Sequence, residues 1–237
     1  KAALFKTFSK VLAQRWELIA TFMAKWSPNY PGQSGHLHQS LWNKDGTSAF
    51  YDETTKHHMS DTFRHYLAGQ IKLLPEVLAM IAPTINSYTR MIKGFWAPTH
   101  SNWGPDNRTC AIRVIPGSEK SHRLEYRIAA ADGNPYLALA ASIACGLYGI
   151  ENKLELPPMV EGNAYDLNTS LTNMELPNTL EKSTAAFKNS MVMWELFGNT
   201  WVDHFTISRE WETKCYNEQK QGDPDWHWML DRYFEII

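Results

Sequence analysis

The spacing of apolar residues predicts a helix at the start of the chain. Apolar side chains recur there mostly at three- and four-residue steps, which is the period of an amphipathic helix. The positions are Leu4, Phe5, Phe8, Val11, Leu12, Ile19, Phe22 and Met23. The stretch Ser27–Gly35 then brings together Pro, Gly, Ser and Asn, which favours a loop. We therefore expect one long helix that continues to Met23.

Three later segments have the pattern of strands. His36–Trp42 is followed by an Asp-Gly turn at residues 45–46. Arg108–Ile115 and His122–Ile128 are separated by a short Pro-Gly-Ser-Glu-Lys stretch, which predicts a hairpin with a mobile tip. Gly94–Asn107 mixes Gly, Pro, Asn and Asp and is expected to be a loop.

Helices are expected around these strands. Ser60 can cap a helix that runs through Leu74, and Pro75–Ala82 is expected as a separate short helical piece. Tyr136–Gly149 is rich in small residues and follows a proline suited to a first helical turn. Two or three helices are expected to fill the chain from residue 167 to Ile237. Strands among helices without regular βαβ alternation predict an α+β fold with an antiparallel sheet rather than a doubly wound one.

Composition narrows the class of protein. The chain has 237 residues, 43% of them hydrophobic, which suffices for one large or two small domains. A net charge of -2 argues against a general nucleic-acid or membrane surface, and no apolar run reaches the roughly 18 residues of a membrane span. Cys110, Cys145 and Cys215 are far apart and show no metal-binding spacing, so we expect reduced thiols in a cytoplasmic protein.

One strand places chemistry-bearing residues on a single face. Every second side chain of a strand shares a face, so His36, His38 and Ser40 point to one side of this strand. The side chains that point to the other side are those of Leu37, Gln39 and Leu41. Two imidazoles and a hydroxyl after a glycine-rich loop suit a metal or a phosphate. This segment by itself favours an ordinary pair of surface or core histidines, but both interpretations stay open here.

The expected hairpin carries an unusual density of arginine. Arg123, Glu125 and Arg127 share one face of the second strand. The five arginines within 38 positions are Arg90, Arg108, Arg113, Arg123 and Arg127. A solvated face with weak cross-strand ion pairs is one interpretation. The other is an anion clamp, because the planar guanidinium group matches carboxylates and phosphates.

Five short blocks, taken together, resemble a known family. In chain order they are Ser34-Gly35-His36-Leu37-His38-Gln39-Ser40-Leu41, Asn86-Ser87-Tyr88-Thr89-Arg90, Asn107-Arg108-Thr109-Cys110-Ala111-Ile112-Arg113, Arg123-Leu124-Glu125-Tyr126-Arg127 and Asn134-Pro135-Tyr136-Leu137-Ala138. Each block alone is weak, but their order resembles the signature blocks of the glutamine synthetase superfamily. The resemblance implies a catalytic domain over residues 1–237 of an ATP-dependent, ADP-forming ligase that joins glutamate to an amine or ammonia through a γ-glutamyl phosphate.

The resemblance also implies roles for single residues. His36 and Glu125 correspond to ligands of a Mg²⁺ or Mn²⁺ ion. Arg108 and Arg113 correspond to the catalytic pair that stabilises the phosphoryl group. The residues that correspond to substrate contacts are Gly32, Arg90, Trp96 and Arg127, and those that correspond to ATP contacts are His38, Ser40, Lys120 and Arg123.

One departure from the family pattern bears on the substrate. Ammonia-using members carry an acid within Gly-Tyr-Glu-Ala-Pro, whereas this chain reads Gly94-Phe95-Trp96-Ala97-Pro98. An indole cannot accept a proton, but it can pack an alkyl chain or a cation. We therefore expect a γ-glutamyl-amide ligase acting on an organic amine. Two alternatives are an ammonia-using glutamine synthetase in which another residue supplies the base, and a structural protein of the same fold, which the retained arginines disfavour.

Further family elements are missing from the chain. The upstream Glu-x-Glu strand, two more metal-binding glutamates and the small N-terminal domain are absent, and Gly32-Gln33-Ser34-Gly35 replaces the Gly-Ser-Gly-Met of many relatives. The chain opens at Lys1 within a helical pattern, so we expect a truncated domain that is inactive alone and a homo-oligomer in the full-length protein. Tyr165, in the polar loop at residues 163–166, matches a loop that some bacterial relatives modify, although an ordinary loop tyrosine is the simpler interpretation.

Overall fold

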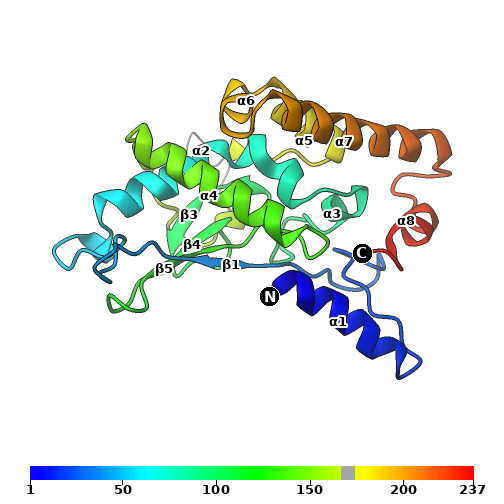
Figure 1. Cartoon of the computed structure of the whole chain (residues 1–237), viewed down its shortest axis with the longest axis horizontal. Coiled ribbons are helices and arrows are strands. Elements are labelled where there is room, and N and C mark those ends of the chain that lie inside the picture. Colours follow the sequence, from blue (N-terminus) through cyan, green and yellow to red (C-terminus); the bar gives the residue numbers. More distant parts are fainter. Residues whose placement is uncertain (167–173) are drawn as a thin grey trace.

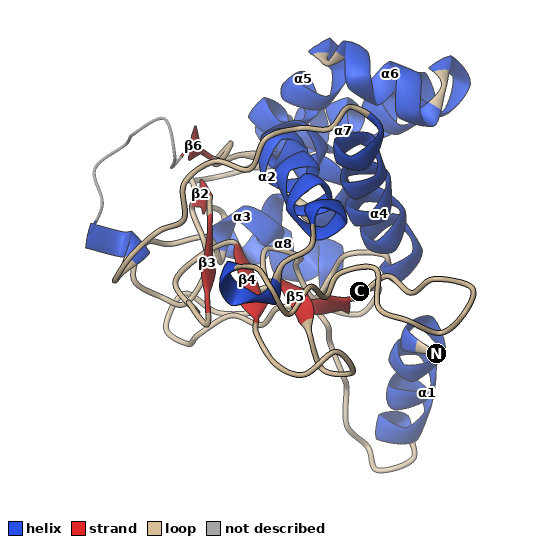
Figure 2. Ribbon diagram, turned by 90° about the vertical axis from the view of Figure 1, so that its left-hand side faces the viewer, coloured by secondary structure: helices blue, strands red, loops and turns tan. Residues whose placement is uncertain are grey.

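The computed structural model describes residues 1–166 and 174–237 and shows an α+β fold. Four strands form one sheet in the order β1 (Leu37–Gln39), β5 (Arg123–Tyr126), β4 (Ile112–Ile115) and β3 (Trp103–Pro105). The expected β4–β5 hairpin is confirmed, and β1 pairs with β5 in the expected antiparallel sense. The strand β3 runs parallel to β4, so the sheet is mixed. The strand β3 lies in the segment expected to be a loop. Figures 1 and 2 show the helices α2 and α4 along one side of this sheet.

The helix α2 (Asp61–Ile81) is longer than expected because Pro75 does not end it. Its first turn is capped by Ser60, whose Oγ accepts from the backbone N–H of Phe63 at 3.1 Å. A proline leaves the carbonyl four residues earlier without its helical donor. Here that carbonyl belongs to Ile71, and the hydroxyl of Ser101 donates to it at 2.6 Å. A side chain from the strand β2 (His100–Ser101) thus replaces the missing bond and keeps the helix continuous.

The core lies where α2 packs against α4 (Pro135–Glu151), which confirms the helix expected at residues 136–149. Asn134 caps α4 by accepting from the N–H of Tyr136 at 2.9 Å. The two helices approach closely at two glycines. A Cβ on Gly69 would lie 2.7 Å from the Cα of Gly149, which is closer than real Cβ contacts allow.

The first helix is shorter than expected. The helix α1 covers Ala2–Gln14 and is followed by a turn in which Glu17 has a φ of 57°. Phe22 and Met23 therefore do not continue its apolar stripe, and none of its residues is buried. Figure 1 shows α1 at the edge of the molecule, apart from α2 and α4. The spacing of apolar residues correctly predicted a helix here, but the same spacing continues past the turn that ends α1, so the expected helix was too long.

Four helices lie within residues 174–237, where two or three were expected. They are α5 (Leu180–Asn189), α6 (Met191–Phe197), α7 (Asn199–Gln219) and α8 (Trp226–Tyr233). Residues 167–173, which fall in the same expected range, lie outside the described residues. The remaining elements are the five-residue helix α3 (Ile85–Thr89), the short strand β6 (Met174–Glu175) paired with β2, and 3₁₀ turns at Lys56–His58 and Ala164–Asp166. Among the described helices, none is long and apolar enough to cross a membrane.

Candidate active site

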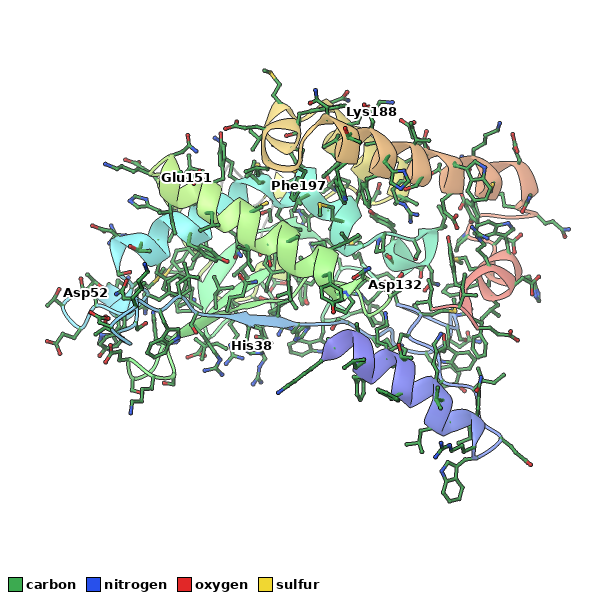
Figure 3. The ribbon with its side chains drawn as sticks, in the orientation of Figure 1. His38, Asp52, Asp132, Glu151, Lys188 and Phe197 are labelled. Atoms are coloured by element: carbon green, nitrogen blue, oxygen red, sulfur yellow. The ribbon has the colours of Figure 1, made fainter. Side chains whose placement is uncertain are left out.

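Strand alternation divides the central sheet into an apolar side and a polar side. Leu124 and Tyr126 of β5 are fully buried towards the helices, and Gln39 of β1 accepts from the hydroxyl of Tyr66 on α2 at 2.7 Å. The antiparallel register places His38 beside Glu125, so both belong to the opposite, polar side. The face alternation expected from the sequence is therefore confirmed. Figure 3 labels His38 on the side of β1 that faces away from the helices.

The carboxylate of Glu125 is the centre of the polar side. Its Oε1 accepts from Nη1 of Arg127 at 3.1 Å and lies 3.0 Å from Nδ1 of His36. Its Oε2 accepts from Nη1 of Arg113 at 3.4 Å, and Nε2 of His38 lies 3.9 Å from Oε1. Burial alone would raise the pKa of Glu125, but Arg127, His36 and Arg113 outweigh it and hold that pKa below its ordinary value. The carboxylate is therefore ionised at neutral pH.

His36 bridges Glu125 and the preceding loop. Its Nε2 lies 2.9 Å from Oγ of Ser34, and its side chain is 30% exposed. Burial and the neighbouring Arg127 lower the pKa of His36, although Glu125 opposes them. A neutral imidazole beside an ionised carboxylate is the donor pair that Mn²⁺ accepts well and Mg²⁺ adequately. The pair thus fits one side of a divalent metal, while the described residues contain no group of three or more such ligands.

Arg90 is a buried guanidinium with few partners. It is 6% exposed, its Nη2 donates to the carbonyl of Ile128 at 2.8 Å, and its Nε is buried without a hydrogen-bond partner among the described residues. Burial lowers the pKa of Arg90 to about 10. Gly32 lies against its stem, since a Cβ there would be 2.8 Å from Cγ of Arg90. A buried cation with an unused hydrogen-bond donor is stabilised when an anion binds to it, and a substrate carboxylate would be such an anion.

Trp96, Arg108 and Arg113 line one open cavity of about 700 Å³. Trp96 has a φ of 59° and a 64% exposed side chain. A bulky residue in this backbone region is strained, and such strain clusters at functional sites. The guanidinium of Arg108 is exposed and has no ion pair among the described residues, whereas Nη2 of Arg113 donates to Oδ1 of Asp106 at 2.8 Å.

Only two of the four residues predicted to contact ATP are joined by a hydrogen bond. Nε of Arg123 donates to Nδ1 of His38 at 3.1 Å, which joins two of them. Ser40 is exposed and accepts from the indole N–H of Trp42 at 3.0 Å. Lys120 is exposed at the tip of the β4–β5 hairpin. Within the part of the chain that the structure describes, Ser40 and Lys120 form no hydrogen bond or ion pair with the other predicted site residues.

Two carboxylates near the site were missed by the sequence analysis. Asp106 is paired with Arg113, and a turn aspartate carries no sequence signal for such a role. Asp132 is buried, and its Oδ2 accepts from the hydroxyls of Thr84 and Ser87, which form the capping box of α3. Arg90 is the C-terminal cap residue of that same short helix. Asp132 therefore fixes the element that presents Arg90, and the Thr84-x-x-Ser87 spacing was the one available signal.

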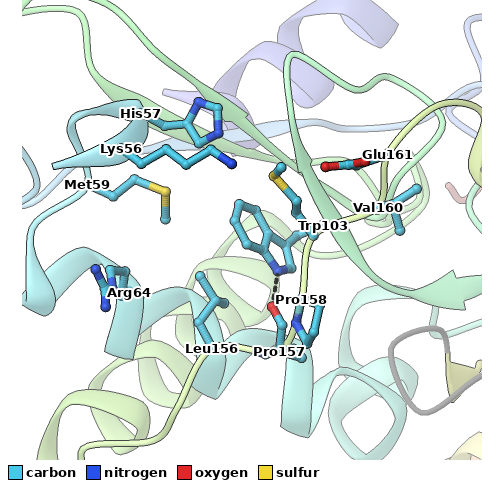
Figure 4. Close-up of a pocket in the computed structure, with 11 residues that line it drawn as sticks. Lys56, His57, Met59, Arg64, Trp103, Leu156, Pro157, Pro158, Val160 and Glu161 are labelled. Atoms are coloured by element: carbon cyan, nitrogen blue, oxygen red, sulfur yellow. Dashed lines mark hydrogen bonds between the residues drawn. The ribbon is translucent and has the colours of Figure 1, made fainter.

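A second open cavity of about 730 Å³ lies between α2 and the loop before residue 163. Figure 4 shows Lys56, His57 and Arg64 on one side of it and Trp103 on the other, with the indole N–H donating to the carbonyl of Pro157 at 2.8 Å. The hydroxyl of the nearby Tyr165 is buried and has no hydrogen-bond partner among the described residues.

Comparisons with known proteins identify the family of this chain. Residues 1–228 match the family model described as glutamine synthetase, catalytic domain. The chain is 46% identical to type-1 glutamine synthetase 2 of Dictyostelium discoideum over 240 residues, which cover 100% of this chain and 45% of that protein. It is 39% identical to the glutamate–isopropylamine ligase of a Pseudomonas species, covering 100% of this chain and 50% of that protein. It is 40% identical to a γ-glutamylethanolamide synthetase of Streptomyces coelicolor, covering 98% of this chain and 47% of that protein.

A solved structure gives the same result for the fold. A GmaS–ADP complex superimposes with a TM-score of 0.84 at 29% sequence identity, covering 98% of this chain and 53% of that one. The chain belongs to the glutamine synthetase catalytic-domain family. It spans about half the length of the curated relatives it matches.

Proposed function

We propose that this chain is the catalytic-domain half of an ATP-dependent, ADP-forming ligase that joins glutamate to an organic amine. The observation that carries the proposal is the cavity that holds Trp96 together with Arg108 and Arg113. Two guanidinium groups suit a phosphorylated carboxylate, and an exposed indole beside them suits the hydrocarbon of an amine. The names of the isopropylamine ligase and the ethanolamide synthetase among its relatives support an organic amine.

The acid substrate would bind beside Glu125. Arg90 and Arg127 are both buried, and each has an Nε without a hydrogen-bond partner among the described residues. Such donors lower the energy of a bound dicarboxylic amino acid because its carboxylates satisfy them. Gly32 would allow the loop backbone to approach the substrate closely, since no side chain fits there.

The phosphoryl group would be transferred along the polar side of the sheet. His38, Ser40, Lys120 and Arg123 would contact ATP, while Arg108 and Arg113 would stabilise the charge that accumulates on the transferring oxygens. His36 and Glu125 would hold a divalent metal, Mg²⁺ or Mn²⁺, which when bound adds positive charge next to the phosphates. The γ-carboxylate of glutamate becomes an acyl phosphate, and an amine nitrogen then forms the new C–N bond as phosphate leaves.

The remaining metal ligands would come from outside these 237 residues. Because the chain spans about half of its relatives and offers one imidazole–carboxylate pair, we propose a longer, cytoplasmic, homo-oligomeric protein that completes the site. Its partners would be small molecules rather than nucleic acid or membrane.

A competition experiment tests the proposed nucleophile. The complete protein is incubated with ATP, Mg²⁺, glutamate and equal concentrations of ammonium and isopropylamine, and the products are separated by mass. We expect γ-glutamylisopropylamide or another tested alkylamide to exceed glutamine. If glutamine dominates against every alkylamine and polyamine tested, the organic-amine assignment is wrong. If no ADP forms with any nucleophile, the ligase assignment itself is wrong.

An ammonia-using glutamine synthetase is the second candidate. The name of the Dictyostelium relative, a glutamine synthetase that is 46% identical, favours it. The same competition experiment separates the two candidates, because an ammonia-using enzyme must make glutamine as its main product.

A further inference from the structure

We propose that Glu161 is the carboxylate that binds the incoming ammonium group and removes its proton. The inference rests on the proposed ligase function. At neutral pH an alkylamine is a cation, and it cannot attack an acyl phosphate until a proton leaves it. Trp96 cannot accept that proton, whereas a carboxylate that lines the same cavity can.

The cavity contains two carboxylates that qualify by position. Asp106 and Glu161 both line it together with Trp96 and Arg108. Asp106 is already engaged, since its Oδ1 accepts from Nη2 of Arg113 at 2.8 Å. Glu161 is exposed and has no ion pair or hydrogen bond to its side chain in the described part of the chain. Glu161 is therefore the carboxylate that remains free to meet a cation.

The backbone on both sides of Glu161 is fixed to the segment that carries Arg108. The N–H of Val160 donates to the carbonyl of Trp103 at 2.9 Å, and Nδ2 of Asn107 donates to the carbonyl of Gly162 at 2.8 Å. One residue on each side is thus tied to residues 103–107.

Two further contacts support the same segment. The N–H of Ala164 donates to the hydroxyl of Thr109 at 2.9 Å. Val160 and Ala164 are buried against Cys110 in a small apolar cluster. These contacts hold the backbone of Glu161 at the cavity, so its carboxylate stays within reach of the cavity. Such preorganisation is what a catalytic base requires.

Cationic side chains border Glu161 on both sides and suit the phosphate of an acyl phosphate, while Glu161 is the carboxylate among them that can pair with an ammonium group. Arg108 and Arg113 line the same cavity and would face the phosphoryl oxygens. On its other side Glu161 borders the second cavity, where Lys56, His57 and Arg64 lie across the opening, as Figure 4 shows. In the proposed step, one ammonium proton passes to the carboxylate of Glu161, and the freed lone pair forms the C–N bond as the C–O bond to phosphate breaks. The second excess proton on the nitrogen leaves with the departing phosphate.

The test compares two nucleophiles with Glu161→Gln in the complete protein. Isopropylamine is protonated at neutral pH, whereas hydroxylamine is largely neutral and needs no base before it attacks. For isopropylamine we expect kcat/KM to fall by about 10²-fold or more, in line with the contribution of a positioned general base. For hydroxylamine we expect the rate to stay close to that of the wild type. Glu161→Asp should recover part of the loss, and Glu155→Gln, an exposed glutamate on the same loop, should behave as wild type.

Each other outcome has a definite meaning. Equal losses with both nucleophiles would show a structural role for Glu161 and overturn the proposal, as would an unchanged rate with isopropylamine. Failure of the proposed function looks different, because wild-type protein would then release no phosphate with any nucleophile.

Discussion

Nδ1 of His36 lies 3.0 Å from Oε1 of Glu125, although the two residues are 89 positions apart in the sequence. The pairing of β1 with β5 produces this contact, and the alternation of each strand turns both side chains away from the core. The arginines that share Glu125 are anchored in the same way, by β4 and by the end of β5. The clustering of Glu125 with these arginines therefore follows directly from the register of three short strands.

The buried guanidinium of Arg90 should govern the affinity for the acid substrate. Arg90→Lys removes the planar pair of donors but keeps the charge. We expect KM for glutamate to rise by about tenfold to a hundredfold, the value of one or two charge-assisted hydrogen bonds, with a smaller change in kcat. Steady-state kinetics measure this. Arg64→Lys, on the exposed surface of α2, is the matched control, and an equal effect there would contradict the role of Arg90.

The side chain at position 96 should set the choice of nucleophile. Trp96→Glu replaces an indole wall with a proton acceptor, so the ratio of ammonia to isopropylamine turnover should rise by at least about tenfold. Product ratios by mass spectrometry measure the change. Phe95→Glu adds the same charge to a neighbouring side chain that is 66% exposed, and it should leave the ratio unchanged. A ratio that rises equally in both variants would show a general effect of charge.

His122, at the base of the hairpin, should make folding sensitive to acid. Burial, aided by His58, lowers the pKa of His122 from its ordinary 6.5 to about 4. Because the folded state binds the proton more weakly than the unfolded state, the stabilisation is complete above pH 6.5 and is lost as the pH falls towards 4. Thermal unfolding should show a smaller decrease in stability from pH 7.5 to pH 5 for His122→Phe than for the wild type.

A control distinguishes this effect from general acid sensitivity. His204 is exposed on α7, and His204→Gln should keep the pH dependence of the wild type. Phenylalanine at position 122 should also stabilise the protein at neutral pH, since both ring nitrogens of His122 are buried without a partner among the described residues. Parallel pH profiles for wild type and His122→Phe would contradict the assignment.

The isolated 237-residue chain should lack ligase activity. It provides one imidazole–carboxylate pair for a metal, and such a partial ligand set binds a divalent ion weakly. We expect no ADP formation above background and weaker Mn²⁺ binding than in the complete protein, measured by a coupled phosphate assay and by electron paramagnetic resonance. Turnover by the purified chain would contradict this expectation.

Local patterns in the sequence predicted the elements whose side chains have one dominant environment. Strand alternation predicted the faces of β1 and β5, and the cap at Ser60 predicted the start of α2. Pro75 misled because its consequence was decided by a distant hydroxyl, that of Ser101, which no local pattern can indicate. The strand β3 was missed for a similar reason, since a three-residue segment becomes a strand only when β4 pairs with it.

The residues of the candidate site were also predicted only in part. The family blocks predicted Glu125 and the arginines around it as site residues. In the structure, Arg113 and Arg127 form ion pairs with Glu125. Asp132 and Glu161 were not found, because their relevance arises from contacts with Thr84 and from the anchoring of Val160 and Gly162. Such contacts depend on tertiary packing and leave no signature in the sequence of a loop.

Anomalous diffraction from crystals of the complete protein grown with Mn²⁺ tests the metal assignment most directly. We expect a manganese peak within coordination distance of both His36 and Glu125, and no such peak in Glu125→Gln. Glu151→Gln, an exposed glutamate at the end of α4, should leave the peak unchanged. A manganese peak elsewhere, with His36 and Glu125 still hydrogen-bonded to each other, would contradict the proposed site.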